Sequence, residues 1–392
     1  MTSKIIKALE IVFFFITSVF FRFIKKYDNL WLICERGDDA RDNGYSFFNY
    51  LREHQPEINA YYLISKDCDD YGKAIKHGNI ILYKSFKHKS LFFLTRYLIT
   101  AHKGTIEPWN YKIYRSLFGI FNKSQKYVFI QHGVILHDVR QFLCRSNTNF
   151  DLFISGAKPE YYELITNYGY DESEIVYTGL ARHDELHDIT EKNQILFFPT
   201  WRNYLKYDVK SRKLDDFTTG NYYRSIQSLL YNYELARILT RYNYKLYFYL
   251  HNEMVQYIDY FKSNNSRIII VSEHSRDIQK YIKESKMLIT DYSSVSVDFA
   301  YMKKPVVYYQ FDKQLFFNSH YSKGYFSYEE DGFGPVFTDE NDLITYIKMC
   351  LDNNFEVEKI YDIRMDRFFS YRDKNNNKRI FESIKNLNQD KS

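Results

Sequence analysis

One stretch, residues 286–312, restricts the fold of this chain more than any other segment. It starts with a short apolar run at residues 287–289, which has the length of a buried strand. A polar turn follows at residues 290–294, apolar side chains then recur at helical spacing, and Pro305 precedes a second apolar run at residues 306–309. Strand, turn, helix and strand in this order predict a βαβ unit of a parallel sheet.

The turn of this unit, Thr290-Asp291-Tyr292-Ser293-Ser294, is rich in hydroxyl groups and stands where a helix begins. The unbonded N–H groups and the positive dipole end of a helix start suit phosphate, and the hydroxyls would add neutral donors. The chain has neither the P-loop pattern nor the G-x-G-x-x-G fingerprint. The alternative is that Asp291, Ser293 and Ser294 only cap the helix, and spacing alone does not separate the two interpretations.

Composition narrows the class of protein. The 392 residues suit two domains of ordinary size. The net charge of +5 is spread along the chain, whereas nucleic-acid-binding proteins usually concentrate basic residues on one face, so we expect no nucleic-acid partner. No C-x-x-C pair or metal-ligand spacing occurs among the cysteines, as is typical of a reducing cytosol. These cysteines are Cys34, Cys68, Cys144 and Cys350.

Residues 1–26 form a separate N-terminal segment around the apolar run IVFFFITSVFF at residues 11–21. As a helix, residues 8–21 would rise about 21 Å, short of the roughly 30 Å hydrocarbon core, and no small-residue cleavage site follows. We therefore expect a peripheral or monotopic interfacial helix on the cytoplasmic face of the membrane, held by phenylalanines and flanking basic residues. A true span with snorkelling Lys7 and Arg22, or a helix buried against the protein, are the alternatives.

In the first half of the chain, residues 27–187, strands alternate with helical patterns, which predicts an α/β domain with a parallel sheet. His132 and Gly133 directly follow a buried strand at residues 128–130. Open parallel sheets bind ligands at the carboxyl ends of their strands, and a glycine there lets a substrate approach the backbone. His132 is therefore a candidate general base, the alternative being a structural histidine with satisfied hydrogen bonds.

The segment at residues 175–187 is interpreted as the hinge between the two domains. It carries His183 and His187 four residues apart, a spacing that can bind zinc. Because no third ligand is evident in the sequence, we predict no metal site.

The second half, residues 188–392, places polar side chains after successive strands in the same way. Arg202 ends a strand that starts at residue 195, where its planar fork can meet phosphate, although a surface arginine is an equal alternative. Residues 204–222 are predicted to be a loop and residues 223–242 one helix. A lone His251 follows the next strand, at residues 245–250.

The motifs follow one another in a specific order: His132-Gly133, Pro-Thr-Trp-Arg ending at Arg202, His251, and Thr-Asp-Tyr-Ser-Ser before a helix that ends Lys304-Pro305. This order, between about residues 127 and 335, resembles the CDP-glycerol glycerophosphotransferase family of teichoic acid polymerases, primases and capsule-synthesis relatives. The resemblance implies a GT-B-like fold, with two Rossmann-like domains whose parallel sheets face a cleft, and membrane association. The acceptor domain would be residues 27–187 and the CDP-donor domain residues 188–392, whose terminal helix could pack back on the first domain.

The resemblance also implies roles for individual residues. His132 would be the catalytic base and His251 would lie by the donor pyrophosphate. Asp298, on the following helix, would bind the ribose, by a weaker analogy with GT-B enzymes. The remaining predicted donor-binding or phosphate-binding residues are Arg202, Thr290, Asp291, Ser293 and Ser294.

The implied reaction transfers a polyol phosphate from CDP-glycerol or CDP-ribitol to a hydroxyl of a membrane-linked glycan or polyol-phosphate acceptor. His132 would remove the hydroxyl proton, the oxygen would attack the β-phosphorus in line, and CMP would leave as a phosphodiester forms. No cofactor or metal is required in this scheme. The alternatives are a GT-B glycosyltransferase that uses a nucleotide sugar and a non-catalytic scaffold in polymer assembly.

Overall fold

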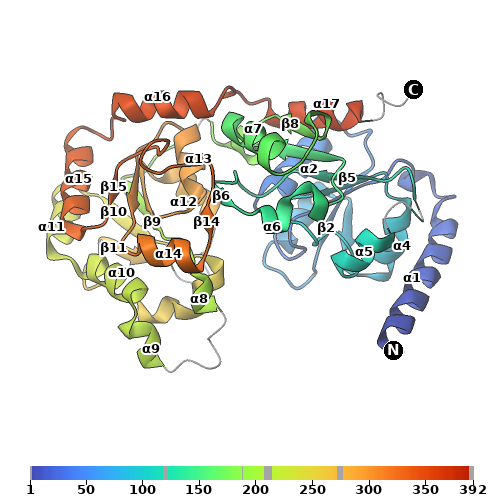
Figure 1. The fold of residues 1–392 in the computed structure, drawn as a ribbon, viewed down its shortest axis with the longest axis horizontal. Coiled ribbons are helices and arrows are strands. Elements are labelled where there is room, and N and C mark those ends of the chain that lie inside the picture. The colour runs from blue at the N-terminus through green and yellow to red at the C-terminus, as the bar shows by residue number, and fades with distance from the viewer. Residues whose placement is uncertain are drawn as a thin grey trace. The chain divides into compact units, whose positions relative to one another are not determined.

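The computed structural model describes residues 2–117, 120, 122–187, 189–206, 214–271 and 277–387. The chain divides into two compact units. The first comprises residues 1–134, 140–185 and 373–392, and the second comprises residues 135–139 and 186–372. Each unit is an α/β structure built on a parallel sheet (Figure 1).

The sheet of the first unit has the strand order β3-β2-β1-β4-β5-β7-β8, and every neighbouring pair in it is parallel. Every residue of β1, β2, β4 and β7 is buried, as expected for a sheet covered on both faces. The strands are β1 (Trp31–Cys34), β2 (Ala60–Ile64), β3 (Ile80–Leu82), β4 (Tyr97–Thr100), β5 (Lys126–Phe129), β7 (Leu152–Ser155) and β8 (Ile175–Tyr177).

The order of these strands reverses between β1 and β4, so this unit has a topological switch point there. The helices of the unit are α1 (Thr2–Phe21), α2 (Asn43–His54), α3 (Tyr71–Ala74), α4 (Phe86–Leu91), α5 (Tyr111–Leu117), α6 (Arg140–Leu143), α7 (Lys158–Asn167) and α17 (Asn376–Asn386). Short 3₁₀ helices include η3 (Phe92–Leu94) and η6 (Ala181–Glu185).

The sheet of the second unit, in the order β11-β10-β9-β12-β13-β15, is also parallel and reverses between β9 and β12. Its strands are β9 (Gln194–Phe198), β10 (Lys245–Phe248), β11 (Ile268–Ile270), β12 (Met287–Thr290), β13 (Val306–Tyr309) and β15 (Val336–Phe337). The predicted βαβ unit is confirmed as β12, α13 (Val295–Tyr301) and β13. A separate antiparallel pair joins β6 (His137–Asp138) to β14 (Ser322–Lys323).

The other helices of this unit are α8 (Asn203–Lys206), α9 (Leu214–Thr219), α10 (Asn221–Tyr231), α11 (Tyr233–Arg241), α12 (Ile278–Glu284), α14 (Lys313–Ser319), α15 (Glu340–Asp352) and α16 (Lys359–Phe368), with the 3₁₀ segment η7 (Asn252–Tyr260).

Two predictions about this unit were wrong. The single helix predicted at residues 223–242 is divided into α10 and α11 at Asn232, whose backbone is extended (φ −64°, ψ 121°). The side chain of Asn232 accepts a hydrogen bond from the Leu235 N–H and so starts the second helix. The loop predicted at residues 204–222 contains most of α8 and all of α9, while residues 207–213 lie outside the described residues.

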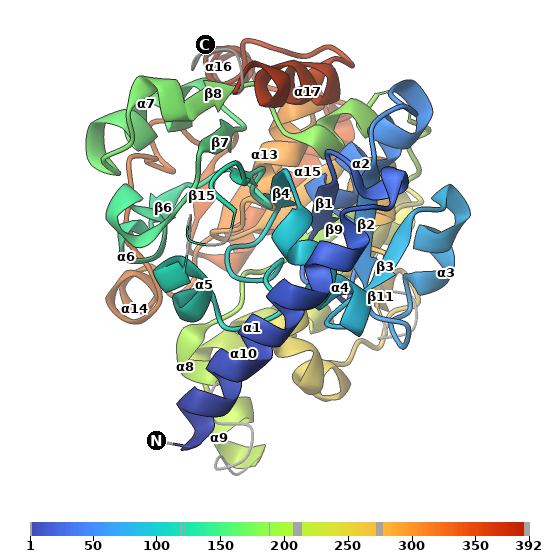
Figure 2. The same ribbon diagram turned by 90° about the vertical axis from the view of Figure 1, so that its right-hand side faces the viewer.

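The N-terminal helix α1 lies along α4 and η3 (Figure 2). Ile11 and Phe14 are buried in a cluster with Phe93, and Trp109 packs against it. The opposite face of α1 leaves large apolar side chains exposed: Ile6, Leu9, Phe13, Ile16 and Phe20. Among the helices that the structure describes, none is both long enough and apolar enough to cross a membrane.

Candidate functional site

His132 follows β5 in the first unit, and a set of hydrogen bonds fixes the backbone around it. Gln131, in the left-handed region at φ 41°, donates from Nε2 to the Ile154 carbonyl and to Glu160, each over 2.9 Å. The Gln131 carbonyl accepts from Asn43 Nδ2 (2.8 Å), and the His132 carbonyl accepts from Arg182 Nη1 (2.5 Å). The His132 side chain is exposed while its main chain is held from several sides.

The loop after β1 holds Arg182, whose side chain binds the His132 carbonyl. The buried carboxyl of Glu35 accepts hydrogen bonds from the N–H groups of Arg41, Asp42 and Tyr45 over 2.7–3.0 Å. Asp42 caps α2 and pairs with Arg182 Nη1 at 2.7 Å. The loop and Arg182 therefore form one hydrogen-bonded network beside His132.

A second imidazole lies against the predicted base. The ring of His102, which follows β4, stacks on His132 with centroids 4.5 Å apart and an angle of 20°. Desolvation by the surrounding protein lowers the pKa of His132; Asp42 opposes this shift, whereas Arg36 and Arg182 reinforce it. Burial and the neighbouring His132 place the pKa of His102 well below its ordinary value. Both rings are therefore neutral at neutral pH.

In the second unit, Arg202 lies just beyond β9 and is fully buried. Nε and Nη2 bind both carboxylate oxygens of Asp312 (2.8 and 2.9 Å), and Nη2 also binds Asp291 (2.7 Å). Nη1 donates to the carbonyl oxygens of Thr200 (2.7 Å) and Trp201 (3.4 Å). These bonds account for all five N–H groups of the guanidinium.

This geometry differs from the predicted contact of Arg202, Thr290 and Asp291 with phosphate. Asp291 accepts from the N–H groups of Thr200 (2.7 Å) and Tyr292 (2.6 Å), and the Thr290 hydroxyl donates to the Phe198 carbonyl (2.6 Å). A buried charge is costly unless it is paired, and here the partners come from the ends of three neighbouring strands. These residues hold the turn and are positioning residues in this structure.

The turn itself leaves two hydroxyl residues as candidates for direct phosphate contact. Ser293 is 8% exposed and accepts from the Val295 N–H (3.2 Å), and Ser294 is half-buried at the start of α13 without a side-chain capping bond. Asp298 is only 1% exposed within α13. The contact of Asp298 with a ribose stays a prediction.

His251 follows β10, as predicted, and both His251 and His320 lie near Trp201 in the same unit. His251 Nδ1 accepts from the Glu253 N–H (3.2 Å), and its ring lies 6.3 Å from that of Trp201. The ring of His320 lies 4.4 Å from that of Trp201 in an edge-to-face arrangement, and its Nδ1 accepts from the Asn203 N–H (2.8 Å). Burial, then Arg202, His137 and His251, lower the pKa of His320 to about 3, and its buried Nε2 has no hydrogen-bond partner.

The sequence prediction missed several residues that the structure brings to these groups: Glu35, Asp42, His102, Arg182, Asp312 and His320. Four of these residues are charged, namely Glu35, Asp42, Arg182 and Asp312. The sequence signal that could have identified them is their position after a predicted strand. Within the described residues, no three His, Cys, Asp or Glu side chains are arranged to hold a metal. His187 is instead within hydrogen-bond distance of the Tyr301 hydroxyl (3.1 Å).

Comparison with known proteins shows the family of the chain. Residues 14–386 match the family described as CDP-Glycerol:Poly(glycerophosphate) glycerophosphotransferase. The chain belongs to this family. Because the match extends over nearly the whole chain, both units are included.

The names of two curated relatives place those proteins in teichoic acid synthesis. The minor teichoic acid biosynthesis protein GgaB of Bacillus subtilis (strain 168) is 32% identical over 372 residues, which are 92% of this chain and 40% of that protein. The teichoic acid ribitol-phosphate polymerase TarK of Staphylococcus aureus (strain NCTC 8325 / PS 47) is 25% identical over 219 residues, 55% of this chain and 38% of TarK. The chain thus spans about two fifths of the length of each.

A solved structure shares the fold. A structure of the wall teichoic acid polymerase TagF superposes with a TM-score of 0.68 at 16% identity and covers 100% of both chains. This likeness confirms the predicted α/β fold with parallel sheets.

Proposed function

We propose that this chain transfers a polyol phosphate, most simply glycerol phosphate, from a CDP-activated donor to a hydroxyl of a lipid-linked acceptor. The product is a phosphodiester in a teichoic acid or capsular polymer, and CMP is the leaving group. Family membership supports the reaction class and a CDP-glycerol donor. The name of GgaB supports a role in teichoic acid synthesis, and the name of TarK supports CDP-ribitol as the alternative donor. The proposal keeps the GT-B-like assignment, because both parallel sheets carry the predicted site residues after the carboxyl ends of their strands.

His132 carries the proposal. Its ring is exposed at the carboxyl end of β5, and its carbonyl accepts a hydrogen bond from Arg182. Desolvation by the surrounding protein lowers its pKa and so favours the neutral form. A neutral imidazole can accept the proton of an acceptor hydroxyl, and the resulting oxygen attacks the β-phosphorus of the donor as the bond to CMP breaks.

The second unit is assigned to donor binding. His251, His320, Ser293 and Ser294 supply donors for the pyrophosphate, while the Arg202 network holds the turn that presents the serines. Preorganised donors of this kind stabilise the charge on a transferring phosphoryl group without reorganisation. The scheme uses protein donors and includes no cofactor or metal.

We assign the protein to the cytoplasmic face of the membrane as a peripheral protein. The exposed apolar face of α1 and the basic residues near its ends, Lys7, Arg22, Lys25 and Lys26, support this assignment.

The test is CMP release from CDP-glycerol, CDP-ribitol and a panel of nucleotide sugars, with a lipid-linked acceptor. We expect turnover of one CDP-polyol, and His132→Ala should reduce it by about 10²–10⁴-fold while the protein stays folded. Turnover of a nucleotide sugar alone would instead make this chain a glycosyltransferase, and unchanged turnover in the variant would remove His132 as the base.

A further inference from the structure

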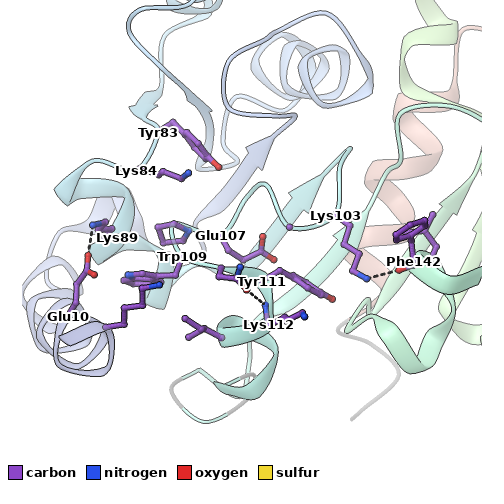
Figure 3. A pocket seen from close by; sticks show the side chains of 16 residues that line it. Glu10, Tyr83, Lys84, Lys89, Lys103, Glu107, Trp109, Tyr111, Lys112 and Phe142 are labelled. Carbon is purple, nitrogen blue, oxygen red and sulfur yellow. Dashed lines mark hydrogen bonds and ion pairs between the residues drawn. The ribbon is translucent and has the colours of Figure 1, made fainter. Parts of the chain in front are cut away.

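A cavity of about 800 Å³ lies in the first unit, beside α1 (Figure 3), and His132 is not among the residues that line it. Its walls come from α1, from the segment between β3 and α4, from the loop after β4, and from the start of α5. This volume is in the range of ligand-binding pockets and is larger than a phosphate group needs. Neither the predicted motifs nor the proposed reaction uses any residue that lines it.

The cavity is strongly basic. Five lysines line it: Lys7, Lys84, Lys89, Lys103 and Lys112. Lys89 is paired with Glu10, and the other acidic residue of the lining, Glu107, is buried with its pKa raised to about 7 by that burial. At neutral pH the cavity therefore keeps an excess of positive charge, which suits an anionic ligand with more than one negative charge.

Buried contacts hold the walls of the cavity in place. Lys84 is in the left-handed region (φ 56°), and its N–H donates to His88 Nδ1 (3.0 Å). The other ring nitrogen of His88 bonds to the Ile106 carbonyl (3.1 Å), and burial lowers the pKa of this histidine to about 3. A neutral His88 therefore joins the segment that carries Lys84 to the loop that carries Lys103.

Two features of the cavity point to a ligand that combines phosphate with less polar groups. The indole N–H of Trp109 is buried without a hydrogen-bond partner, which is a costly state that a bound acceptor atom would relieve. The rings of Tyr83, Trp109 and Tyr111 supply flat apolar walls between the lysines (Figure 3). Such rings can stack on the carbon face of a sugar attached to the phosphate.

The helix α1 contributes to the cavity on one side and exposes apolar residues on another. Lys7 and Glu10 of this helix line the cavity, while Leu9, Phe13 and Ile16 on its other side are exposed. One helix thus borders both a phosphate-binding cavity and a surface suited to lipid chains.

We propose that this cavity binds the phosphate-bearing head of the lipid-linked acceptor, with the lipid chain along the exposed face of α1. The inference rests on the proposed function, because it gives the acceptor of that reaction a place to bind. It assigns Lys84, Lys103 and Lys112 to the phosphates and the Trp109 N–H to an oxygen of the head group.

The experiment measures binding of farnesyl diphosphate, a soluble isoprenoid diphosphate, to the full chain by calorimetry, without any CDP donor. We compare the wild type with the triple variant Lys84→Gln, Lys103→Gln, Lys112→Gln. The matched control removes the same charge from exposed lysines of the same unit, as Lys66→Gln, Lys76→Gln, Lys158→Gln. Loss of even one hydrogen bond to a charged group corresponds to about tenfold in affinity, so the cavity variant should bind at least that much more weakly than the control.

Two further arms keep the test decisive. Trp109→Phe keeps the ring and removes the N–H, and it should weaken farnesyl diphosphate binding severalfold even if the triple variant proves unstable. Sedimentation with phosphatidylglycerol vesicles should be equal for the cavity and control variants, since the face of α1 is unchanged in both.

Equal farnesyl diphosphate affinity in the cavity and control variants would overturn the proposal. So would a cavity variant that loses vesicle binding alone, because the lysines would then serve bulk anionic lipid. Both readouts are independent of turnover, so absence of CMP release would count against the proposed function and not against this site.

Discussion

Arg202 is the residue whose role changes most between the motif and the structure. Its guanidinium is fully buried and joins Asp291, which follows β12, to Asp312, which follows β13. The rings of Tyr222, Tyr292 and Phe316 lie 5.0–5.2 Å from it. A planar fork suits this place because two carboxylates are bound at once, which a lysine ammonium cannot reproduce.

We expect Arg202→Lys to destabilise the protein by about 3 kcal/mol or more, because it leaves buried carboxylates without their partner. Denaturant unfolding measures this change, and Arg224→Lys, at an exposed position of the same unit, is the control. A variant of unchanged stability that loses only affinity for the CDP donor would show that Arg202 contacts phosphate after all.

The pH dependence of turnover reports the state of His132. Its pKa lies below the ordinary value of 6.5, so the base stays unprotonated into mildly acidic solution, and the acid limb of kcat/KM should fall below that pH. Arg36 is one of the charges that lowers this pKa, and its side chain is exposed. Arg36→Gln should therefore move the acid limb to higher pH with the plateau kept. An acid limb that stays in place in the variant would mean that another group sets it.

For single residues, the sequence predicted which side chains follow strands, but it did not predict which side chains they contact. His132, Arg202 and His251 all follow strands, as their motifs indicated. The bond from Arg202 to Asp312 joins residues 110 positions apart, and the stack of His102 on His132 depends on β4 and β5 being neighbours. Neither pairing has a sequence spacing that would reveal it.

Among the elements, strands were predicted better than helix boundaries. The buried strands are short apolar runs, so their positions follow from hydrophobicity alone. The break between α10 and α11 depends on one capping bond of Asn232, within an apolar pattern that continues on both sides. The spacing of apolar residues cannot reveal a helix break when the same spacing continues on both sides of it.

The last helix, α17, packs on the first unit although the second unit precedes it in sequence. Ile380, Phe381 and Ile384 lie in the core of the first unit, and the N–H groups of Asn376 and Asn377 both bond to Asp184 (2.9 Å each). Asp184 lies in η6, the segment that also carries Arg182.

We expect a chain that ends at residue 372 to lose stability in the first unit, because large apolar side chains of its core would become exposed. Hydrogen exchange should show faster opening of α2 and η6, which contact α17, and the support of His132 through Arg182 should weaken. A chain that ends at residue 387 keeps every described contact and is the control. Equal protection of η6 in the two truncated chains would show that α17 is dispensable.

For the whole molecule, the proposed attachment to a membrane through α1 can be tested separately from folding. Deleting α1 would confuse two effects, because Ile11 and Phe14 are part of the protein core whereas Leu9, Ile16 and Phe20 face outward at 64%, 54% and 71% exposure. Substituting the outward set alone separates membrane contact from folding. Glutamine has a helix propensity close to that of leucine, so α1 should persist in such a variant.

We therefore expect the triple variant Leu9→Gln, Ile16→Gln, Phe20→Gln to keep its thermal stability and to leave the membrane fraction. Each buried apolar side chain contributes about 1.5–3 kcal/mol, so losing three should lower the partition coefficient by several powers of ten. Exposed apolar residues of the second unit provide a matched control, as Met349→Gln, Ile360→Gln, Ile363→Gln. If both triple variants stay with the membrane equally, α1 is not the anchor, and basic residues elsewhere in the chain must account for the attachment.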